Sequence, residues 1–311
     1  MSNASILETS GDKPLLALIA GPTASGKSDV AVAMAQEIER GGGRAVIVNA
    51  DSAQVYADLM VLSARPSPEE MGGIEHRLFG EWDGAQSCSA ADWAAAAKRE
   101  IADIHAAGGT PILVGGTGLY IRTLLDGIAP VPPIDPAIRA AVRALPVAEA
   151  YAALQIEDPE RAARLAPADI ARVGRALEVV RSTGRTLADW QTRKEGGIAA
   201  QVQLSPAVLL PERKALYDRC DLRFARMIER GAIGEVEALR ARQLDPDLPV
   251  MRAIGVPELS GFLDGKWSIE HAIALGSQAT RNYAKRQFTW LRHQLPGEWP
   301  RLQLDHVDLD E

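Results

Sequence analysis

The segment L-L-A-L-I-A-G-P-T-A-S-G-K-S, which runs from Leu15 to Ser28, decides the fold. Six apolar residues precede the pattern Gly-x-x-x-x-Gly-Lys-Ser, and a helical pattern follows it at once. This order of buried strand, glycine-rich loop and helix is the context that a phosphate-binding loop requires. The alternative is a chance glycine turn between a strand and a helix, and four fixed positions in the right context argue against it. We therefore predict that a phosphorylated ligand binds at Gly21–Ser28.

The residues of this loop have distinct expected parts in binding. The glycines let successive backbone N–H groups point at phosphate oxygens, and the following helix directs its positive end at the same anion. Lys27 adds a point charge, and the Ser28 hydroxyl can ligate a Mg²⁺ ion held by the phosphates. The motif defines the charge of the ligand and not its remainder, so ATP, other nucleotides and other diphosphates are all compatible with it. The predicted binding residues are Gly21, Pro22, Thr23, Ala24, Ser25, Gly26, Lys27 and Ser28.

Length and composition indicate a soluble, globular protein. The chain has 311 residues, which corresponds to two domains or to one domain with a large insertion, and 47% of them are hydrophobic. Two cysteines are too few for a disulfide framework or a zinc ribbon. The first residues lack the pattern of a secretory signal, and no apolar run approaches the length of a membrane span. We expect a monomeric cytoplasmic protein with no membrane partner.

The distribution of charge leaves a nucleic-acid partner open. The net charge of −7 alone argues against a polyanionic partner. However, the segment from Ser277 to Gln294 contains Arg281, Lys285, Arg286 and Arg292 and no acidic residue. Nucleic-acid binding depends on such a local basic face and not on the sum over the chain.

Strand patterns alternate with helical patterns in the first part of the chain. Short apolar runs at Ala45–Val48 and Pro111–Val114 follow the first strand, and each is separated from the next by a helical segment. A later run at Ala207–Leu210 resumes the pattern. This alternation is typical of a parallel, doubly wound sheet. We predict an α/β fold of the P-loop type.

A proline-rich segment marks the clearest boundary in the chain. Ala129–Pro136 contains four prolines, and from there to about Gly197 the periodicity is helical, with no convincing strand. We predict an all-helical insertion domain. The expected divisions are a first part of the core at 1–128, the insertion at 129–205, and a second part of the core with C-terminal helices at 206–311.

Candidate catalytic residues follow the predicted strands. Asp51 comes directly after the second strand, at the edge of an open α/β sheet where ligands bind. It is either a proton acceptor for a nucleophile or a turn former. Thr117 follows the third strand and is either a site residue or a helix N-cap. Because that strand ends in Gly115-Gly116-Thr117 with no acidic residue, and no Asn-Lys-x-Asp motif occurs, the ATPase and GTPase interpretations are weakened.

Taken together, the motifs resemble those of the tRNA dimethylallyltransferase family of bacteria. The phosphate loop alone does not identify this family, but the set of motifs does, and it spans most of the chain in order. The matching segments are Gly21–Ser28, Asn49–Tyr56, Gly115–Tyr120, Arg172–Glu178 and Arg281–Arg292. Two segments depart from the family pattern, namely Met60–Pro66 and Gly255–Pro257.

The resemblance implies a reaction and a set of site residues. A member of this family moves a dimethylallyl group from its diphosphate to the exocyclic amine of adenosine 37, next to the anticodon of a tRNA. By this resemblance Asp51 is the general base, Thr117 also belongs to the catalytic site, and Arg223 joins the phosphate loop and Mg²⁺ in holding the diphosphate. The implied contacts to the tRNA anticodon stem-loop are Asp51, Ser52, Ala53, Gln54, Thr117, Arg139, Ala171, Arg172, Val173, Gly174, Arg175, Arg252, Ala253, Ile254, Gly255, Arg281, Lys285 and Arg286.

Two other functions remain open at the level of sequence. A kinase of a small molecule or nucleoside would use Asp51 as base and Arg172 with Arg175 as lid clamps. Arginines at this spacing share one face of a helix, although solvated surface arginines are commoner than anion clamps. A nucleotide-gated RNA-binding module is the non-enzymatic alternative, but binding alone does not need a carboxylate at the strand end.

Overall fold

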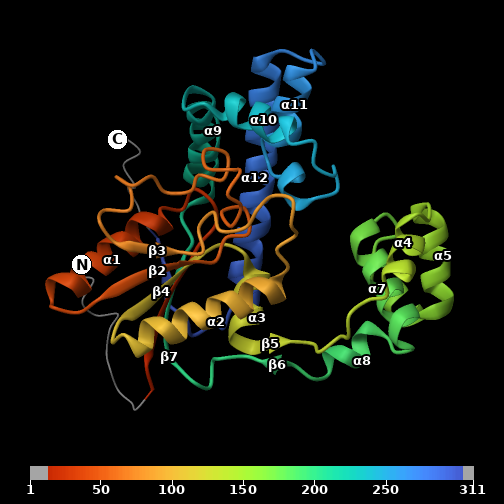
Figure 1. The fold of residues 1–311 in the computed structure, drawn as a ribbon, viewed down its shortest axis with the longest axis horizontal. Coiled ribbons are helices and arrows are strands. Elements are labelled where there is room, and N and C mark those ends of the chain that lie inside the picture. The colour runs from red at the N-terminus through yellow and green to blue at the C-terminus, as the bar shows by residue number, and fades with distance from the viewer. Residues whose placement is uncertain (1–12, 304–311) are drawn as a thin grey trace. The chain divides into compact units, whose positions relative to one another are not determined.

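The computed structural model describes residues 13–303, and its contacts divide the chain into two compact units (Figure 1). Among the described residues, the core unit comprises 13–124 and 198–303. The helical unit comprises Leu125–Gly197. The insertion was expected at 129–205, so the compact helical unit begins and ends somewhat earlier than that segment. Within the described part of the chain, no helix is both long and apolar enough to cross a membrane.

A six-stranded parallel sheet forms the centre of the core unit. Its strands lie in the order β3-β2-β4-β1-β7-β8, and every pairing between them is parallel. This arrangement confirms the predicted α/β fold with a doubly wound sheet. The strands are β1 (Leu15–Ala20), β2 (Ala45–Asn49), β3 (Glu75–Arg77), β4 (Thr110–Gly115), β7 (Gln203–Leu209) and β8 (Arg301–Leu302).

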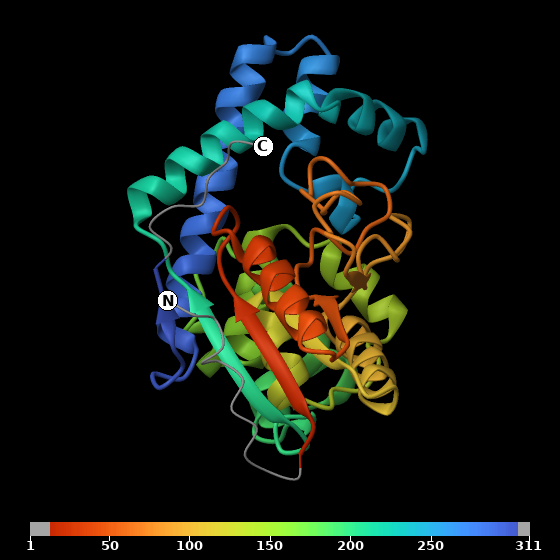
Figure 2. The ribbon, with the colours of Figure 1, turned by 90° about the vertical axis from the view of Figure 1, so that its left-hand side faces the viewer.

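Helices cover the sheet because its central strands are apolar on both faces. Ala17 and Ile19 of β1 pack in one buried cluster with Met34 of α1 (Lys27–Arg40). On α2 (Ala90–Ala106) the Trp93 indole N–H donates to the Asn49 carbonyl at 2.9 Å. From the central strand β1 the chain moves toward the β3 edge of the sheet to form β2, and it later returns toward the centre to form β4. Because right-handed crossovers in opposite directions place their helices on opposite faces, α1 and α2 cover different faces of the sheet. Figure 2 shows α1 lying along one face of the strands. A capping box formed by Ser89 and Asp92 begins α2.

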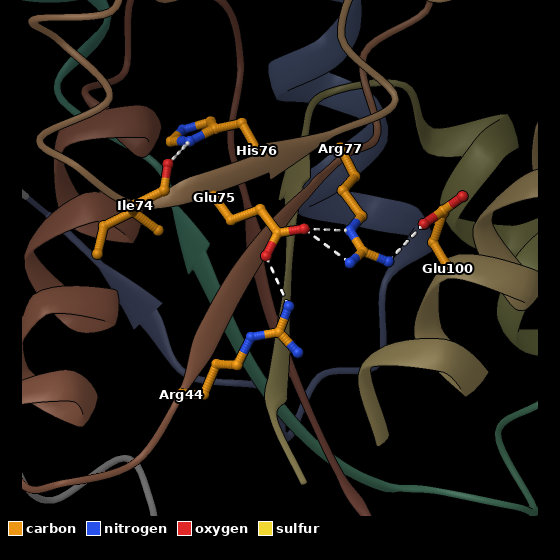
Figure 3. A network of polar contacts seen from close by, with 6 residues as sticks. All are labelled: Arg44, Ile74, Glu75, His76, Arg77 and Glu100. Carbon is orange, nitrogen blue, oxygen red and sulfur yellow. Dashed lines mark hydrogen bonds and ion pairs between the residues drawn. The ribbon is translucent and has the colours of Figure 1, made fainter. Parts of the chain in front are cut away.

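The sequence analysis did not predict the two outer strands. β3 has only three residues, all polar, and β8 has two. Figure 3 shows how charge surrounds β3: the Glu75 carboxylate accepts hydrogen bonds from Arg44 at 2.6 Å and Arg77 at 2.7 Å, and Arg77 also donates to Glu100 at 2.7 Å. Short, charged edge strands resist pairing with another chain.

Helices at the end of the chain complete the core unit. They are α9 (Arg213–Glu229), α10 (Ala232–Ala241), the 3-10 helix η2 (Pro249–Arg252), α11 (Val256–Leu263) and α12 (Ile269–Gln294), with α3 (Gly118–Asp126) following β4. α9 and α12 share a buried cluster that includes Cys220 and Phe288. Gly276 makes this close packing possible, because a Cβ atom there would lie 2.0 Å from the Phe224 ring. Helices α9 to α12 correspond to the C-terminal helices that were expected in the second part of the core, at 206–311.

The helical unit has a small core of its own. Its helices are α4 (Pro136–Arg143), α5 (Val147–Glu157), α6 (Pro159–Ala162), α7 (Ile170–Thr183) and α8 (Leu187–Gln191). Val142, Leu154 and Leu177 are buried between them. The expectation of no strand before Gly197 was wrong in one detail. β6 (Glu195–Gly196) pairs antiparallel with β5 (Gly127–Ile128), where Gly127 and Gly196 both have a positive φ. A two-residue strand of this kind carries no periodicity that sequence reasoning could detect.

Candidate active site and phosphate-binding loop

The phosphate-binding loop has the geometry that its sequence predicts. It leaves β1 after Ala20 and enters α1 at Lys27, so the N-terminus of this helix faces the loop. Ala24 and Gly26 both adopt a positive φ, of 60° and 80°. A positive φ is uncommon for alanine, and Ala24 is held there by packing against the cluster of α9 and α12. The Gly21 N–H donates to the Gly115 carbonyl at 3.1 Å, which ties the loop to the end of β4.

Two cations from different helices converge on this loop. Lys27 is only 7% exposed, and burial lowers the pKa of its ammonium group, while the nearby Asp51 raises it and Arg223 lowers it further. Arg223 reaches the loop from α9, where its guanidinium lies 3.4 Å from the Thr23 hydroxyl. Burial also lowers the pKa of Arg223. Keeping two poorly hydrated cations close together costs free energy, and a bound anion would offset this cost. The prediction that Arg223 joins the loop therefore agrees with its position.

Asp51 is held rigidly beside this cationic pair. The Asn49 side chain accepts from the Asp51 N–H at 2.8 Å and donates to the Asp51 carbonyl at 3.1 Å. One carboxylate oxygen of Asp51 accepts the Ala53 N–H at 3.0 Å, and the residue is 5% exposed. Because Asn49 is fully buried at the end of β2, it fixes the direction in which Asp51 leaves the sheet.

Thr117 connects the end of β4 to the loop that carries Asp51. Its hydroxyl accepts the Ser52 N–H at 2.9 Å and donates to the Ser52 hydroxyl at 3.2 Å. This hydroxyl therefore serves the site and not the end of α3. Tyr283 of α12 lies close to the same group, and burial raises the pKa of its phenol. Sequence reasoning missed Tyr283, although it lies in the basic, acid-free stretch that had been singled out.

A cavity of about 350 Å³ opens beside these groups. Many of the predicted site residues line it, namely Thr23, Asp51, Ser52, Ala53, Arg223, Arg252, Ala253, Ile254 and Arg286. The structure adds an apolar and aromatic side to the cavity that the motifs did not reveal, including Tyr56, Leu59, Tyr120 and Met227. Tyr56 and Tyr120 end two of the matching motif segments, but only the packing of the core unit brings them together with Leu59 and Met227.

Other predicted residues lie near the cavity without lining it. The Gln54 side chain donates to the carbonyls of Ser63 and Ala64 at 3.1 and 2.7 Å, so it organises the loop that follows. Gly255 has a φ of 99° and begins α11. Arg281 pairs with Asp221 of α9, and Lys285 is exposed on α12. Ser28 is half-buried in the first turn of α1.

The segment Met60–Pro66 departs from the family pattern, and α10 holds its first residues. The Glu235 carboxylate accepts the backbone N–H groups of Met60, Val61 and Leu62, the last two at 2.9 and 2.8 Å. Leu62 and Ser63 then line the cavity. This segment is thus part of the site despite its unusual sequence.

The helical unit presents a separate group of arginines. Glu178 of α7 is 6% exposed, and the guanidinium groups of Arg139, Arg143 and Arg175 surround its carboxylate at 3.9, 3.3 and 3.8 Å. Arg172 pairs with Asp169 at 3.3 Å. The sequence analysis named three of these arginines and missed Arg143, whose spacing from Arg139 on α4 would have indicated it.

The remaining predicted residues of α7 differ in exposure. Val173 is fully buried in the core of the helical unit. Its side chain therefore has a packing role and does not form part of a contact surface. Ala171 is exposed and Gly174 half-buried.

Fold and site together define an α/β protein with a glycine-rich loop between a strand and a helix, a buried carboxylate next to it and an adjoining cavity. A family model described as "IPP transferase" matches residues 54–294. The chain is 65% identical to a tRNA dimethylallyltransferase of Erythrobacter litoralis, over 94% of this chain and 92% of that relative. It is 64% identical to one of Sphingopyxis alaskensis, over 94% and 96%.

Solved structures agree with these matches. A full-length tRNA isopentenylpyrophosphate transferase of Bacillus halodurans is similar with a TM-score of 0.66 at 32% identity, covering 96% of this chain and 92% of that one. A eukaryotic dimethylallyltransferase described as acting on tRNA is similar with a TM-score of 0.77 at 27% identity, covering 93% and 74%. The chain therefore belongs to the IPP transferase family, a family of prenyltransferases, which confirms the resemblance seen in the sequence. None of these relatives supports the kinase alternative.

Proposed function

We propose that this protein transfers a dimethylallyl group from dimethylallyl diphosphate to the exocyclic amine of adenosine 37 in tRNA. The observation that carries the proposal is the convergence of Lys27 and Arg223 on one loop, with Asp51 beside them at the mouth of a partly apolar cavity. The cations suit a diphosphate, the carboxylate suits the amine that must lose a proton, and the apolar wall suits a short prenyl chain.

The diphosphate is the leaving group of this reaction, and the loop fits that part. Negative charge grows on the diphosphate as the allylic carbon detaches from it. Cations that are already fixed and poorly hydrated stabilise this charge more in the transition state than in the ground state. Lys27 and Arg223 meet this description because burial has lowered the pKa of both.

Asp51 is the group that accepts the proton of the adenosine amine. A general base must lie within hydrogen-bond reach of its proton in a fixed orientation. Asn49 fixes the backbone of Asp51, the Ala53 N–H donates to the Asp51 carboxylate, and Thr117 holds the neighbouring Ser52. Reaching an adenosine in a stacked anticodon loop requires that the base be extruded, which costs a few kcal/mol.

The site suits a Mg²⁺ ion that the diphosphate brings with it. Within residues 13–303, no three His, Cys, Asp or Glu side chains come together as metal ligands. Mg²⁺ commonly keeps several waters and binds through phosphate oxygens and one or two protein oxygens. The Ser28 hydroxyl at the start of α1 is the protein ligand that fits this pattern. The ion would supply additional positive charge to the departing diphosphate.

Two separate groups of arginines, one on the helical unit and one on the core unit, are the proposed contacts to the tRNA anticodon stem-loop. Arg139, Arg143 and Arg175 expose about half of their side chains around Glu178. Exposed guanidinium groups of this kind bind phosphates without reading sequence. Arg252 and Arg286 line the cavity, where an extruded base and its flanking phosphates would enter.

Incubation of the protein with tRNA and dimethylallyl diphosphate, followed by nucleoside mass analysis, tests this proposal. We expect a modified adenosine that carries one added dimethylallyl group and depends on the diphosphate donor. The same reaction with labelled ATP in place of that donor tests the kinase alternative. Transfer of phosphate to any acceptor, without formation of a prenylated nucleoside, would overturn the proposal.

A further inference from the structure

One side chain of α12 contacts the phosphate-binding loop and has an unused donor there. The Oε1 atom of Gln287 accepts the backbone N–H of Thr23 at 2.8 Å. This hydrogen bond fixes the orientation of the amide, because a backbone N–H can only donate and must therefore face the oxygen. The Nε2 group of Gln287 consequently remains as a donor. It is buried and has no hydrogen-bond partner.

The end of β4 is shaped to admit this amide. A Cβ atom at Gly116 would lie 2.4 Å from Gln287 Nε2 and 2.6 Å from the Gly21 carbonyl. Real Cβ atoms do not come so close to other atoms, so any other residue at this position would displace the Gln287 amide from the loop. The absence of a side chain at Gly116 is thus explained by the approach of Gln287.

A second buried group at the same loop also lacks a partner. Ser25 is 1% exposed, and its hydroxyl makes no hydrogen bond. Buried polar groups are nearly always paired, and each exception in a native structure requires a reason. Two unpaired polar groups on one loop, next to the desolvated Lys27 and Arg223, are explained together by a polyanion that binds there.

We infer that Gln287 is a ligand of the diphosphate: its Oε1 atom holds Thr23 and its Nε2 group donates to a diphosphate oxygen. This inference rests on the proposed function for the identity of the ligand. It adds to the loop a donor from a helix near the end of the chain. The same helix carries Tyr283, which lines the cavity together with Asp51 and Ser52. α12 therefore contributes side chains both to the loop and to the cavity.

Two substitutions separate a ligand from a structural support. Gln287→Glu keeps an oxygen for Thr23 and replaces the donor by a second oxygen, whereas Gln287→Met removes both contacts at similar volume. If Nε2 binds the diphosphate, Gln287→Met should weaken binding of inorganic pyrophosphate with Mg²⁺ by about 10- to 100-fold, the value of a charge-assisted hydrogen bond. Gln287→Glu also removes the donor and in addition places a negative charge beside the anion. Its effect should equal or exceed that of Gln287→Met.

Calorimetric titration with pyrophosphate gives this readout without turnover, and filter binding of tRNA with thermal unfolding reports whether each variant is folded. Gln294→Glu is the matched control, since it makes the same change on an exposed part of α12. Parental pyrophosphate affinity in folded Gln287→Glu, with a loss confined to Gln287→Met, would overturn the inference in favour of a structural support.

The outcome for Gln287 is distinct from that for the function. If the parent prenylates tRNA and Gln287→Glu binds pyrophosphate normally, the inference fails and the function stands. If the parent does not prenylate tRNA but pyrophosphate binding depends on Gln287, the function fails and the inference about the loop stands.

Discussion

The phosphate loop and the arginine group of the helical unit both present positive charge, but they do so in opposite ways. Lys27 and Arg223 are desolvated and lie beside a buried carboxylate. Arg139, Arg143 and Arg175 keep their guanidinium groups in solvent, and only Glu178 beneath them is buried. Buried charge is costly but strong and weakly screened, whereas exposed charge is inexpensive and weak and is screened by salt. The first suits a transition state, and the second suits a long polyanion.

The largest effect should come from removing the buried carboxylate. We expect Asp51→Ala to reduce single-turnover prenylation by about 10²–10⁴-fold, the usual contribution of a general base, while tRNA affinity stays nearly unchanged. Rapid-quench measurement of the modified nucleoside gives the rate, and filter binding gives the affinity. Rates within threefold of the parent would remove Asp51 from the mechanism.

Removing the buried cation should act almost as strongly, and on the donor alone. We expect Lys27→Ala to lower turnover with dimethylallyl diphosphate by about 10²–10³-fold, because one preorganised contact to the developing charge is lost. Binding of tRNA should be retained, and ATP should not replace the donor. The assay is tRNA prenylation with each donor in parallel. Near-parental turnover of Lys27→Ala, or a modified nucleoside formed with ATP, would contradict this assignment of the loop.

The two regions also differ in how far sequence alone could predict them. The loop from Gly21 to Ser28 has a fixed spacing set by the geometry of a phosphate, so its residues could be named in advance. Asp51 followed from its place at the end of a strand. Tyr283 and Gln287 could not be predicted in the same way, because their positions depend on how α12 packs against the loop after β1 and the residues after β4. The spacing of Arg143 from Arg139 places both on one face of α4, but the buried carboxylate of Glu178 beneath them could not be predicted from the sequence. The short strands β3 and β8 carry no apolar periodicity.

Salt should separate the two regions in one experiment. The affinity for tRNA should fall steeply with salt despite the net charge of −7, by about threefold for each neutralised duplex phosphate when the salt concentration rises fourfold. Affinity for pyrophosphate with Mg²⁺ should change much less, because its ligands are buried. Titrations of each ligand at several salt concentrations provide the two slopes. A slope for tRNA indistinguishable from zero would remove nucleic acid from the list of partners.

The smallest expected effect is that of one exposed arginine. Arg143 lies 3.3 Å from Glu178, and its side chain is 65% exposed, so it is free to turn toward a phosphate at little desolvation cost. We expect Arg143→Ala to weaken tRNA binding by a few fold and to leave pyrophosphate affinity unchanged. The slope of log affinity against log salt concentration should become shallower by the amount that corresponds to about one phosphate contact. Arg193→Ala is the matched control, because Arg193 is also an exposed, paired arginine of the helical unit but lies outside the Glu178 group. An equal loss in both variants would mean that the helical unit contributes only diffuse charge. A loss confined to Arg143→Ala would mean that Glu178 gathers its arginines into a defined phosphate-binding surface.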